Sequence, residues 1–233
     1  MRDAGNELGH FASEMQISRS AIEECLVGYQ RDGYAVVRQL FGSDESDVLS
    51  ARLNERIVRT TQELLGEAAY LHSSQVLLES GAWDWRQDYG YWYTTGCLAP
   101  TLASCIVAID GPAQDNGCLQ VLRGSHNLGR IDHEWSGEHF VADPARVKAA
   151  IDTLERRVVN LAPGDALFVH CNLLHRLEAS SSTSGRRIVI CSYNTERNRP
   201  LRVAANTAMR TLERAVSDLG LGHFATQVPL GQG

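Results

Sequence analysis

The sequence lacks several features that would define a functional class. No apolar run approaches the roughly 18 residues of a membrane-spanning helix, and Met1 to Gln16 contain no apolar secretion signal. Internal repeats and low-complexity segments are also missing. With a net charge of −6 and a pI near 5.7, the chain lacks the basic surplus of a general nucleic-acid or membrane binder. Because 43% of its 233 residues are apolar, we expect a packed core rather than disorder.

Lysine is scarce, and cysteine never occurs in closely spaced pairs. Lys148 is the only lysine among 22 basic residues, which we attribute to codon bias in a GC-rich genome rather than to function. The six cysteines, at positions 25, 97, 105, 118, 171 and 191, form no CxxC pair and show no zinc-site spacing. Most of them lie in apolar stretches, so we expect buried, reduced thiols and a cytoplasmic protein.

A helical first third precedes a strand-rich remainder. The segment from Ser18 to Gly33 begins with capping-box spacing and ends at a glycine, which predicts a helix. Residues 34–40 are typical of a strand, and the apolar spacing of residues 43–65 predicts a second helix. Residues 143–156 and 207–219 are further helix candidates.

From Tyr70 onward, apolar residues recur with a period of two, which indicates strands. Turn residues separate the candidate strands, which are 70–79, 90–94, 103–110, 119–121, 157–161, 166–170, 175–179 and 187–194. Short strands without regular helices between them predict an all-β jelly roll with flanking N- and C-terminal helices. We expect a single domain with a helical part at 1–66, a β core at 70–194 and an extension at 195–233.

Three stretches contain the residues that could take part in catalysis or metal binding. They are GAWDWRQDYGYWY at 81–93, the stretch 110–133 with DNGCLQVLRGSH, and the stretch 163–187 with GDALFVHCNLLH. Together they resemble the phytanoyl-CoA dioxygenase family, and in particular its bacterial ectoine-hydroxylase-like branch, whose members use Fe(II) and 2-oxoglutarate. The resemblance extends from about Tyr29 to Asn194. It implies a double-stranded β-helix, a form of jelly roll, in agreement with the strand pattern.

The resemblance also implies a metal site of two histidines and one carboxylate, with open positions for 2-oxoglutarate and oxygen. Asp88 matches the carboxylate of the family's H-x-D motif, and His175 matches the distal histidine. Arg186 matches the arginine that holds the far carboxylate of 2-oxoglutarate, a role suited to a planar guanidinium. Arg186 and Arg187 would face opposite sides of a strand, so only one of them can point into the barrel.

The sequence departs from the family at the first metal-binding histidine. The family string W-H-Q-D is W-R-Q-D at 85–88, so Arg86 occupies the histidine position. An arginine offers no lone pair and stays charged near neutral pH, so Arg86 cannot ligate a metal. If 86 and 88 lay on one extended strand, Arg86 would sit beside Asp88 and repel Fe(II), at a cost on the order of several kcal/mol.

Three interpretations of Arg86 remain open from the sequence. The metal site is inactivated, or it is rebuilt for other chemistry with Arg86 as the catalytic residue, or another group rescues it. His72, on a neighbouring candidate strand, is one such group. Relative to the family, the chain is shortened near residues 50–70, in a part that would contribute to the substrate lid.

The remaining assignments depend on residue type and strand alternation. The aromatic residues of 81–93 would alternate between core and pocket, and we assign Trp85, Tyr89 and Trp92 to the substrate pocket. Gln120 is a further polar candidate for that pocket. Gln75 is assigned to the cofactor pocket.

The sequence therefore predicts an Fe(II)/2-oxoglutarate-dependent oxygenase that acts on a small molecule, in hydroxylation or related tailoring of a natural product. The alternative is a catalytically altered or inactive homologue, either a partner subunit or a metal-free cyclase or isomerase that uses Arg86. The expected partner is a small-molecule substrate, with no nucleic acid and no membrane. Two assemblies are compatible with the sequence, a homo-oligomer and a pairing with an active homologue.

Overall fold

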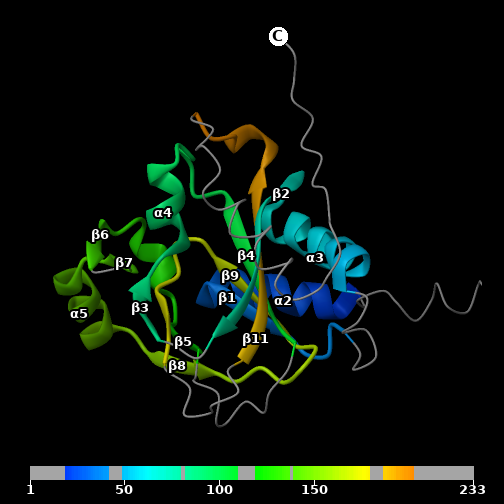
Figure 1. The fold of residues 1–233 in the computed structure, drawn as a ribbon, viewed down its shortest axis with the longest axis horizontal. Coiled ribbons are helices and arrows are strands. Elements are labelled where there is room, and N and C mark those ends of the chain that lie inside the picture. Colours follow the sequence, from blue (N-terminus) through cyan, green and yellow to red (C-terminus); the bar gives the residue numbers. More distant parts are fainter. Residues whose placement is uncertain are drawn as a thin grey trace, which may run out of the picture.

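The computed structural model describes residues 19–41, 49–79, 82–109, 119–136, 139–178 and 186–201, and its main strands build two facing antiparallel sheets (Figure 1). The larger sheet, in spatial order, contains β1 (Tyr34–Val37), β9 (Ala166–His170), β4 (Leu102–Ala108), β11 (Arg186–Thr195) and β2 (Ala69–Glu79). The smaller sheet contains β3 (Trp83–Arg86), β10 (His175–Leu177), β5 (Leu119–Leu122) and β8 (Arg156–Val159). The expected all-β jelly roll is confirmed.

Apolar side chains from both sheets fill the space between them. On β11, Ile188 and Ile190 pack into this interior, whereas Val189 and Cys191 pack on the opposite side of the sheet. The interior cluster also includes Trp83, Ile106, Leu119, Val121, Leu167, Val169 and Leu177.

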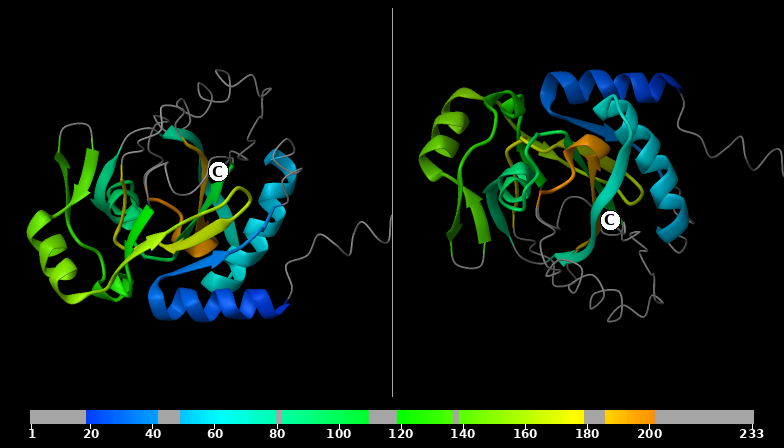
Figure 2. Two further views of the ribbon diagram at one scale, coloured as in Figure 1. Left: turned by 90° about the horizontal axis from the view of Figure 1, so that it is seen from below. Right: turned by 90° about the horizontal axis from the view of Figure 1, so that it is seen from above.

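Two helices cover the outer face of the larger sheet, which is why β4 and β9 are apolar on both faces. They are α2 (Arg19–Asp32) and α3 (Leu49–Leu65), seen in blue and cyan on one side of the molecule in Figure 2. Cys25 and Tyr29 of α2 and Ile57 and Leu64 of α3 pack against this sheet.

A separate unit covers the outer face of the smaller sheet (Figures 1 and 2). It contains the hairpin of β6 (His133–Ser136) and β7 (His139–Ala142) and the helix α5 (Pro144–Thr153). Asp143 caps α5 by accepting a hydrogen bond from the Arg146 backbone N–H, and Pro144 suits the first turn. Val147 and Ala150 of α5 pack against the sheet.

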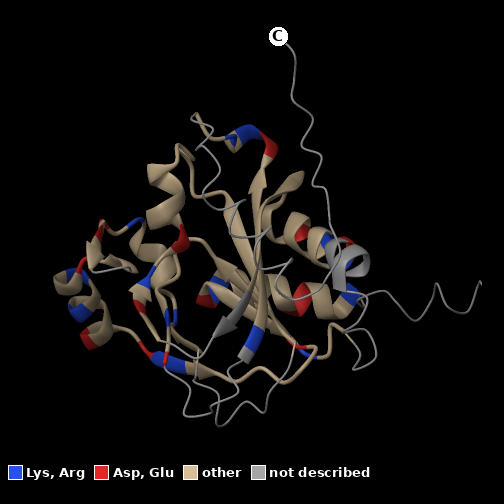
Figure 3. Ribbon diagram, viewed as in Figure 1, with Lys and Arg blue, Asp and Glu red and all other residues tan. Residues whose placement is uncertain are grey.

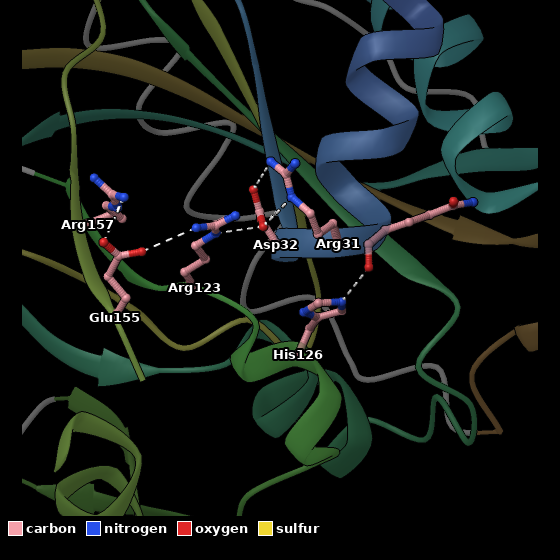
Figure 4. A network of polar contacts seen from close by, with 7 residues as sticks. Arg31, Asp32, Arg123, His126, Glu155 and Arg157 are labelled. Atoms are coloured by element: carbon pink, nitrogen blue, oxygen red, sulfur yellow. Dashed lines mark hydrogen bonds and ion pairs between the residues drawn. The ribbon is translucent and has the colours of Figure 1, made fainter. Parts of the chain in front are cut away.

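An ion-pair network ties the end of α2 to the smaller sheet (Figure 4). Asp32 accepts hydrogen bonds from Arg31, at 2.7 and 2.9 Å, and from Arg123, at 2.7 Å. Arg123 also reaches Glu155 at 3.3 Å, and Glu155 pairs with Arg157 at 2.7 Å. These contacts join residues far apart in sequence and fix the helix layer against the barrel.

Charged residues of both signs are mixed on the helices and outlying segments, while β4 and β9 carry none (Figure 3). Among the described helices, none is long and apolar enough to cross a membrane.

Most expected elements occur close to their predicted positions, with three differences. Residues 90–94, expected as a strand, belong to the helix α4 (Asp88–Thr94). The strand β3 and the hairpin β6–β7 were not expected from the sequence. Short 3-10 turns, at Ser125–Leu128 and Glu196–Asn198, were not expected either.

Other sequence expectations concern the thiols and the C-terminal segment. Cys25, Cys97, Cys105, Cys171 and Cys191 are free and buried, as expected. Cys118 and the helix candidate 207–219 lie outside the described residues. The 1–66 segment contributes β1 to the larger sheet in addition to its two helices.

Candidate functional site

The W-R-Q-D string lies where a strand gives way to a helix. Arg86 is the last residue of β3, and Asp88 is the first residue of α4. The expectation that 86 and 88 project from one extended strand is therefore wrong. The described contacts of Asp88 are to Ser104 and His175, whereas those of Arg86 are to Trp83 and to the strand of His175.

Gln87 fixes this transition through its buried side chain. Its amide nitrogen donates to the carbonyls of Gly129 and Asn172, at 2.8 and 2.7 Å. Its amide oxygen accepts the Ile131 N–H at 2.7 Å, and its own backbone N–H donates to Nε2 of His133 at 2.9 Å. All these polar groups are thus satisfied, and the backbone between Arg86 and Asp88 is held from several loops.

Asp88 and His175 converge at the end of the barrel interior. Oδ1 of Asp88 lies 3.6 Å from Nε2 of His175. Oδ2 of Asp88 accepts a 2.6 Å hydrogen bond from the hydroxyl of Ser104, whose oxygen lies 2.9 Å from that of Ser192. The two serines belong to the central strands β4 and β11, so the larger sheet positions the carboxylate.

His175 presents its lone pair to Asp88. Its Nδ1 lies 3.0 Å from the carbonyl of Leu173 and so acts as the donor, which leaves Nε2 as the acceptor of the neutral ring. Burial lowers the pKa of His175, the Arg86 charge lowers it further, and the Asp88 carboxylate raises it. Oδ1 of Asp88 and Nε2 of His175 are two electron-pair donors 3.6 Å apart, which could serve as two of the three protein ligands of a metal ion.

Arg86 lies beside His175, on the same face of the smaller sheet. It is directly opposite His175 in the β3–β10 register, so the two side chains are cross-strand neighbours. The Arg86 guanidinium carbon lies 3.8 Å from the centre of the Trp83 ring, and that ring meets the His175 ring edge-on at 5.5 Å. Trp83 therefore links the arginine to the histidine.

The described residues fit only part of a three-ligand metal site. Within the ranges that the structure describes, no three His, Cys, Asp or Glu side chains gather as metal ligands. Asp88 and His175 are suitable ligands, while Arg86 is not. His72, the rescuer considered above, is instead near Tyr70, at 3.5 Å, and Cys97, at 4.0 Å, and burial lowers its pKa.

Two of the expected pocket residues lie on the wrong side of the smaller sheet. Trp85 is buried under α5 and the hairpin, in a cluster with Leu122 and Leu174. Gln120 accepts a 3.0 Å hydrogen bond from Arg176, which lies over the Trp85 ring on the same outer side. The assignment of Trp85 and Gln120 to the substrate pocket is therefore corrected.

Tyr89 also has a structural role. It is buried beside Cys97, Leu102 and Cys171, and its hydroxyl donates to the carbonyl of Leu98 at 2.6 Å. These contacts anchor α4 to the following loop, and the assignment of Tyr89 to the substrate pocket stays a prediction.

The other assigned residues are Trp92, Gln75 and Arg186. The Trp92 ring packs edge-on against the His72 ring at 4.5 Å. Gln75, on β2, is half-buried and pairs with Ile190, which faces the interior. Arg186 begins β11, opposite Glu79, but its side chain lies outside the described residues, and Arg187 is exposed.

The sequence reasoning did not single out Ser104, Gln87 or Trp83. A serine at an alternating position of the apolar strand LASCIVA was the available signal for Ser104, because a buried hydroxyl needs a partner. For Gln87, the signal was its fixed place between the two motif residues. Trp83 gave no signal that separated it from its aromatic neighbours.

Relatives of known activity are similar to most of the chain. L-proline trans-4-hydroxylase of Streptomyces griseoviridis is 27% identical over 192 residues, which cover 72% of this chain and 71% of that protein. Ectoine dioxygenase of Halomonas elongata is 26% identical over 181 residues, which cover 70% of this chain and 54% of that protein.

Solved structures share the fold. EctD from S. alaskensis with bound Fe superposes with a TM-score of 0.68 at 20% identity and covers 84% of both chains. The epimerase SnoN, in complex with Fe3+, alpha ketoglutarate and nogalamycin RO, has a TM-score of 0.60 at 21% identity, over 76% of this chain and 85% of that one. The family profile described as phytanoyl-CoA dioxygenase (PhyH) matches residues 64–188, more than half of the sequence. The chain therefore belongs to the phytanoyl-CoA dioxygenase family.

Proposed function

We propose that this protein is an oxygenase of the Fe(II)/2-oxoglutarate type that acts on a small molecule. The observation that carries the proposal is the convergence of Asp88 and His175, 3.6 Å apart, at the end of the barrel interior. The carboxylate is accompanied by hydroxyl groups and an imidazole, an environment that suits a divalent cation.

The residues assigned to the cofactors differ in how well they fit. Asp88 and His175 would hold iron through two side chains, because the family's third ligand position is Arg86. Arg186 would hold the far carboxylate of 2-oxoglutarate, since position 186 of β11 is on the same face of the strand as positions 188 and 190, where Ile188 and Ile190 face the interior. Gln75 would line the same space. When bound, iron would activate oxygen, which is the oxidant, and 2-oxoglutarate would be the co-reductant that is consumed as the substrate is oxidised.

The chain's own groups orient the site. The Ser104 hydroxyl holds Oδ2 of Asp88, so that Oδ1 is directed toward His175. The Leu173 carbonyl holds Nδ1 of His175 and thereby selects the tautomer with a lone pair on Nε2. Trp83 and the apolar interior exclude water from one side of the site.

A role in natural-product tailoring is the finer part of the proposal. It is supported by the fold shared with SnoN and with the carbocyclase SnoK, both described from nogalamycin biosynthesis. The substrate would be a small molecule, and the buried, reduced thiols support a cytoplasmic location.

Iron binding by the wild-type protein and by Arg86→His tests the proposal. Anaerobic Fe(II) titration of the wild type should approach one equivalent, and 2-oxoglutarate should then yield succinate under air. Arg86→His supplies the third ligand and should bind iron at least tenfold more tightly. Iron binding by Arg86→His alone would overturn the oxygenase proposal for the natural sequence.

Arg86 itself supports a second candidate, a catalytically altered homologue. In that case the chain acts as a metal-free cyclase or isomerase, or pairs with an active relative. Turnover in the presence of a chelator identifies the metal-free enzyme, and copurification with a relative identifies the subunit. Neither outcome is expected of the oxygenase.

A further inference from the structure

His133 connects the β6–β7 hairpin to the backbone next to Asp88. Its Nε2 accepts the backbone N–H of Gln87 at 2.9 Å, and Gln87 directly precedes Asp88 at the start of α4. The Phe140 ring of β7 stacks on the imidazole, with ring centres 5.4 Å apart, so the hairpin itself holds the ring in place. A side chain from the unit outside the smaller sheet therefore contacts the segment that carries a candidate metal ligand (Figure 1).

The hydrogen bonds of His133 require a neutral ring in one tautomer. Nδ1 lies 2.8 Å from the Ile131 carbonyl and so donates to it, which leaves a lone pair on Nε2 for the Gln87 N–H. Burial lowers the pKa of His133, although the hydrogen bond to the Ile131 carbonyl opposes this shift. His175 has the same arrangement with the carbonyl of Leu173, two residues earlier. Both rings thus present Nε2 as an acceptor, one to the candidate metal site and the other to the backbone beside it.

The imidazole of His133 also packs directly on the backbone of α4. A Cβ atom built on Gly90 would lie 2.2 Å from Nδ1 of His133 and 2.3 Å from Cε1. Gly90 is buried, and its backbone is not in the left-handed region that favours glycine. Because alanine is otherwise the better helix former, the ring of His133 is what requires glycine at this position.

Two hydrogen bonds hold the backbone on either side of Asp88. The N–H of Gln87, before it, donates to His133, and the N–H of Tyr89, after it, donates to the Cys171 carbonyl at 2.9 Å. Since these bonds restrict the backbone angles of the turn, they limit the directions in which the Asp88 side chain can point. Ligand groups that are held in place before binding lose less freedom when a metal binds.

We propose that His133 is a positioning residue for the candidate metal site, where its neutral imidazole holds the Gln87 N–H and thereby orients the Asp88 carboxylate for a divalent cation shared with His175. The proposal rests on the proposed function, because it takes Asp88 and His175 as metal ligands. His133 acts through Gln87 and is not itself a ligand.

Residue-resolved amide hydrogen exchange measures the hold on Gln87 without any metal. His133→Leu removes the acceptor, so the Gln87 amide should exchange about tenfold faster than in the wild type. His133→Gln can place an amide oxygen near the position of Nε2 and should restore most of the protection. The Tyr89 amide is the internal control, and its exchange rate should stay within about twofold of wild type, because a general loss of stability would accelerate both amides.

The Mn²⁺ affinity of the same variants measures the effect on Asp88. His133→Leu should weaken Mn²⁺ binding about tenfold, and His133→Gln should recover most of that loss. Gly90→Ala displaces the ring without removing it and should weaken binding as His133→Leu does, whereas it should cost no further affinity in a His133→Ala protein. His139→Leu is the matched control, since it removes an exposed histidine of the same hairpin and should leave the Kd within about twofold of wild type.

Three results would overturn the proposal. The first is a Gln87 amide that in His133→Leu exchanges as in the wild type, or is accelerated only in parallel with the Tyr89 amide. The second is His133→Leu protein that binds Mn²⁺ as tightly as wild type. The third is His133→Gln protein that behaves like His133→Leu in both measurements. If His133→Leu does not fold, as judged by circular dichroism, His133→Asn takes its place, because its shorter amide does not reach the Gln87 N–H.

Failure of the proposed function is a distinguishable result. Wild-type protein that binds no Mn²⁺ and no Fe²⁺ contradicts the metal site formed by Asp88 and His175. The exchange rates of the Gln87 and Tyr89 amides need no metal, so they decide in that case whether His133 holds the backbone beside Asp88.

Discussion

Asp32 and Asp88 are two partly buried carboxylates that the molecule treats in opposite ways. Asp32, at the end of α2, accepts hydrogen bonds from the guanidinium groups of Arg31 and Arg123 (Figure 4). Asp88, at the start of α4, accepts one from the Ser104 hydroxyl and faces the imidazole of His175. The arginine nearest to Asp88 in sequence, Arg86, lies over a tryptophan instead.

The difference separates a carboxylate that stabilises the fold from the carboxylate proposed as a metal ligand. The hydrogen bonds from Arg31, followed by those from Arg123, hold the pKa of Asp32 at about 2, below its usual value of 3.8. A carboxylate neutralised by two cations stabilises the fold but attracts no further positive charge. The described polar partners of Asp88 are a hydroxyl and an imidazole, which suits a carboxylate that is to accept a ligand.

The largest expected effect comes from Asp32→Asn. The substitution removes the charge that holds two arginines and should lower the free energy of unfolding by about 2 kcal/mol. Urea denaturation at pH 7 measures this loss. The control is Asp152→Asn, which breaks the exposed pair with Lys148 and should change stability by less than about 0.5 kcal/mol. Equal effects of the two substitutions would contradict a structural role for Asp32.

The pH dependence of that effect sharpens the comparison. Because the folded-state pKa of Asp32 is depressed to about 2, its stabilisation is fully present above the usual value of 3.8. It is lost progressively as the pH falls toward about 2. The stability difference between wild type and Asp32→Asn should therefore shrink between pH 5 and pH 3 in urea titrations. A difference that stays constant over this range would disagree with the ion-pair assignment.

Ser104→Ala should have an intermediate effect on stability and a clear effect on the site. It leaves Oδ2 of Asp88 and the Ser192 hydroxyl without their shared partner, at a cost of about 1 kcal/mol. Without this hydroxyl the carboxylate is less well oriented, so Mn²⁺ affinity should fall about tenfold. Ser192→Ala, one step further from Asp88, is the control and should affect Mn²⁺ binding less. Unchanged Mn²⁺ affinity in Ser104→Ala would remove the positioning role.

The smallest stability change is expected from Asp88→Asn. The amide oxygen can still accept from Ser104, and the amide N–H can donate to Nε2 of His175, so unfolding free energy should stay within about 0.5 kcal/mol of wild type. Mn²⁺ binding should be lost. Asp32→Asn and Asp88→Asn are the same chemical change at two positions, so the pair separates an effect on stability from an effect on metal binding. A loss of stability as large as that of Asp32→Asn would erase the distinction.

The sequence predicted the parts of the fold that local pattern controls. The capping-box spacing near the start of α2 and the alternation in β9 and β11 are clear local signals, and these elements lie close to their predicted positions. Residues 90–94 lie in helix α4 and not in the predicted strand, because tertiary contacts decide their conformation. Tyr89 is anchored to the Leu98 carbonyl, and Gly90 lies so close to the His133 ring that a side chain there would clash.

The sequence indicated that Asp88 and His175 lie close together, but not which way the neighbouring side chains of β3 face. Asp88 and His175 were brought together as the resemblance implied, while a β-bulge in β3 changed the faces of Trp85 and Arg86. A single inserted residue reverses the alternation on which the pocket assignment of Trp85 depended. No residue type in Trp83–Arg86 predicts this bulge.

The buried amide of Gln87 has a consequence for how such a site evolves. Because the backbone around positions 86 and 88 is secured by hydrogen bonds to Gly129, Asn172 and Ile131, it does not depend on a metal or on the side chain at position 86. A mutation at that position can exchange a neutral ligand for a cation while the scaffold persists. Gln87 thus holds the backbone of the motif whatever residue occupies position 86. Substitutions at position 86 can therefore change the chemistry of the site without loss of the fold.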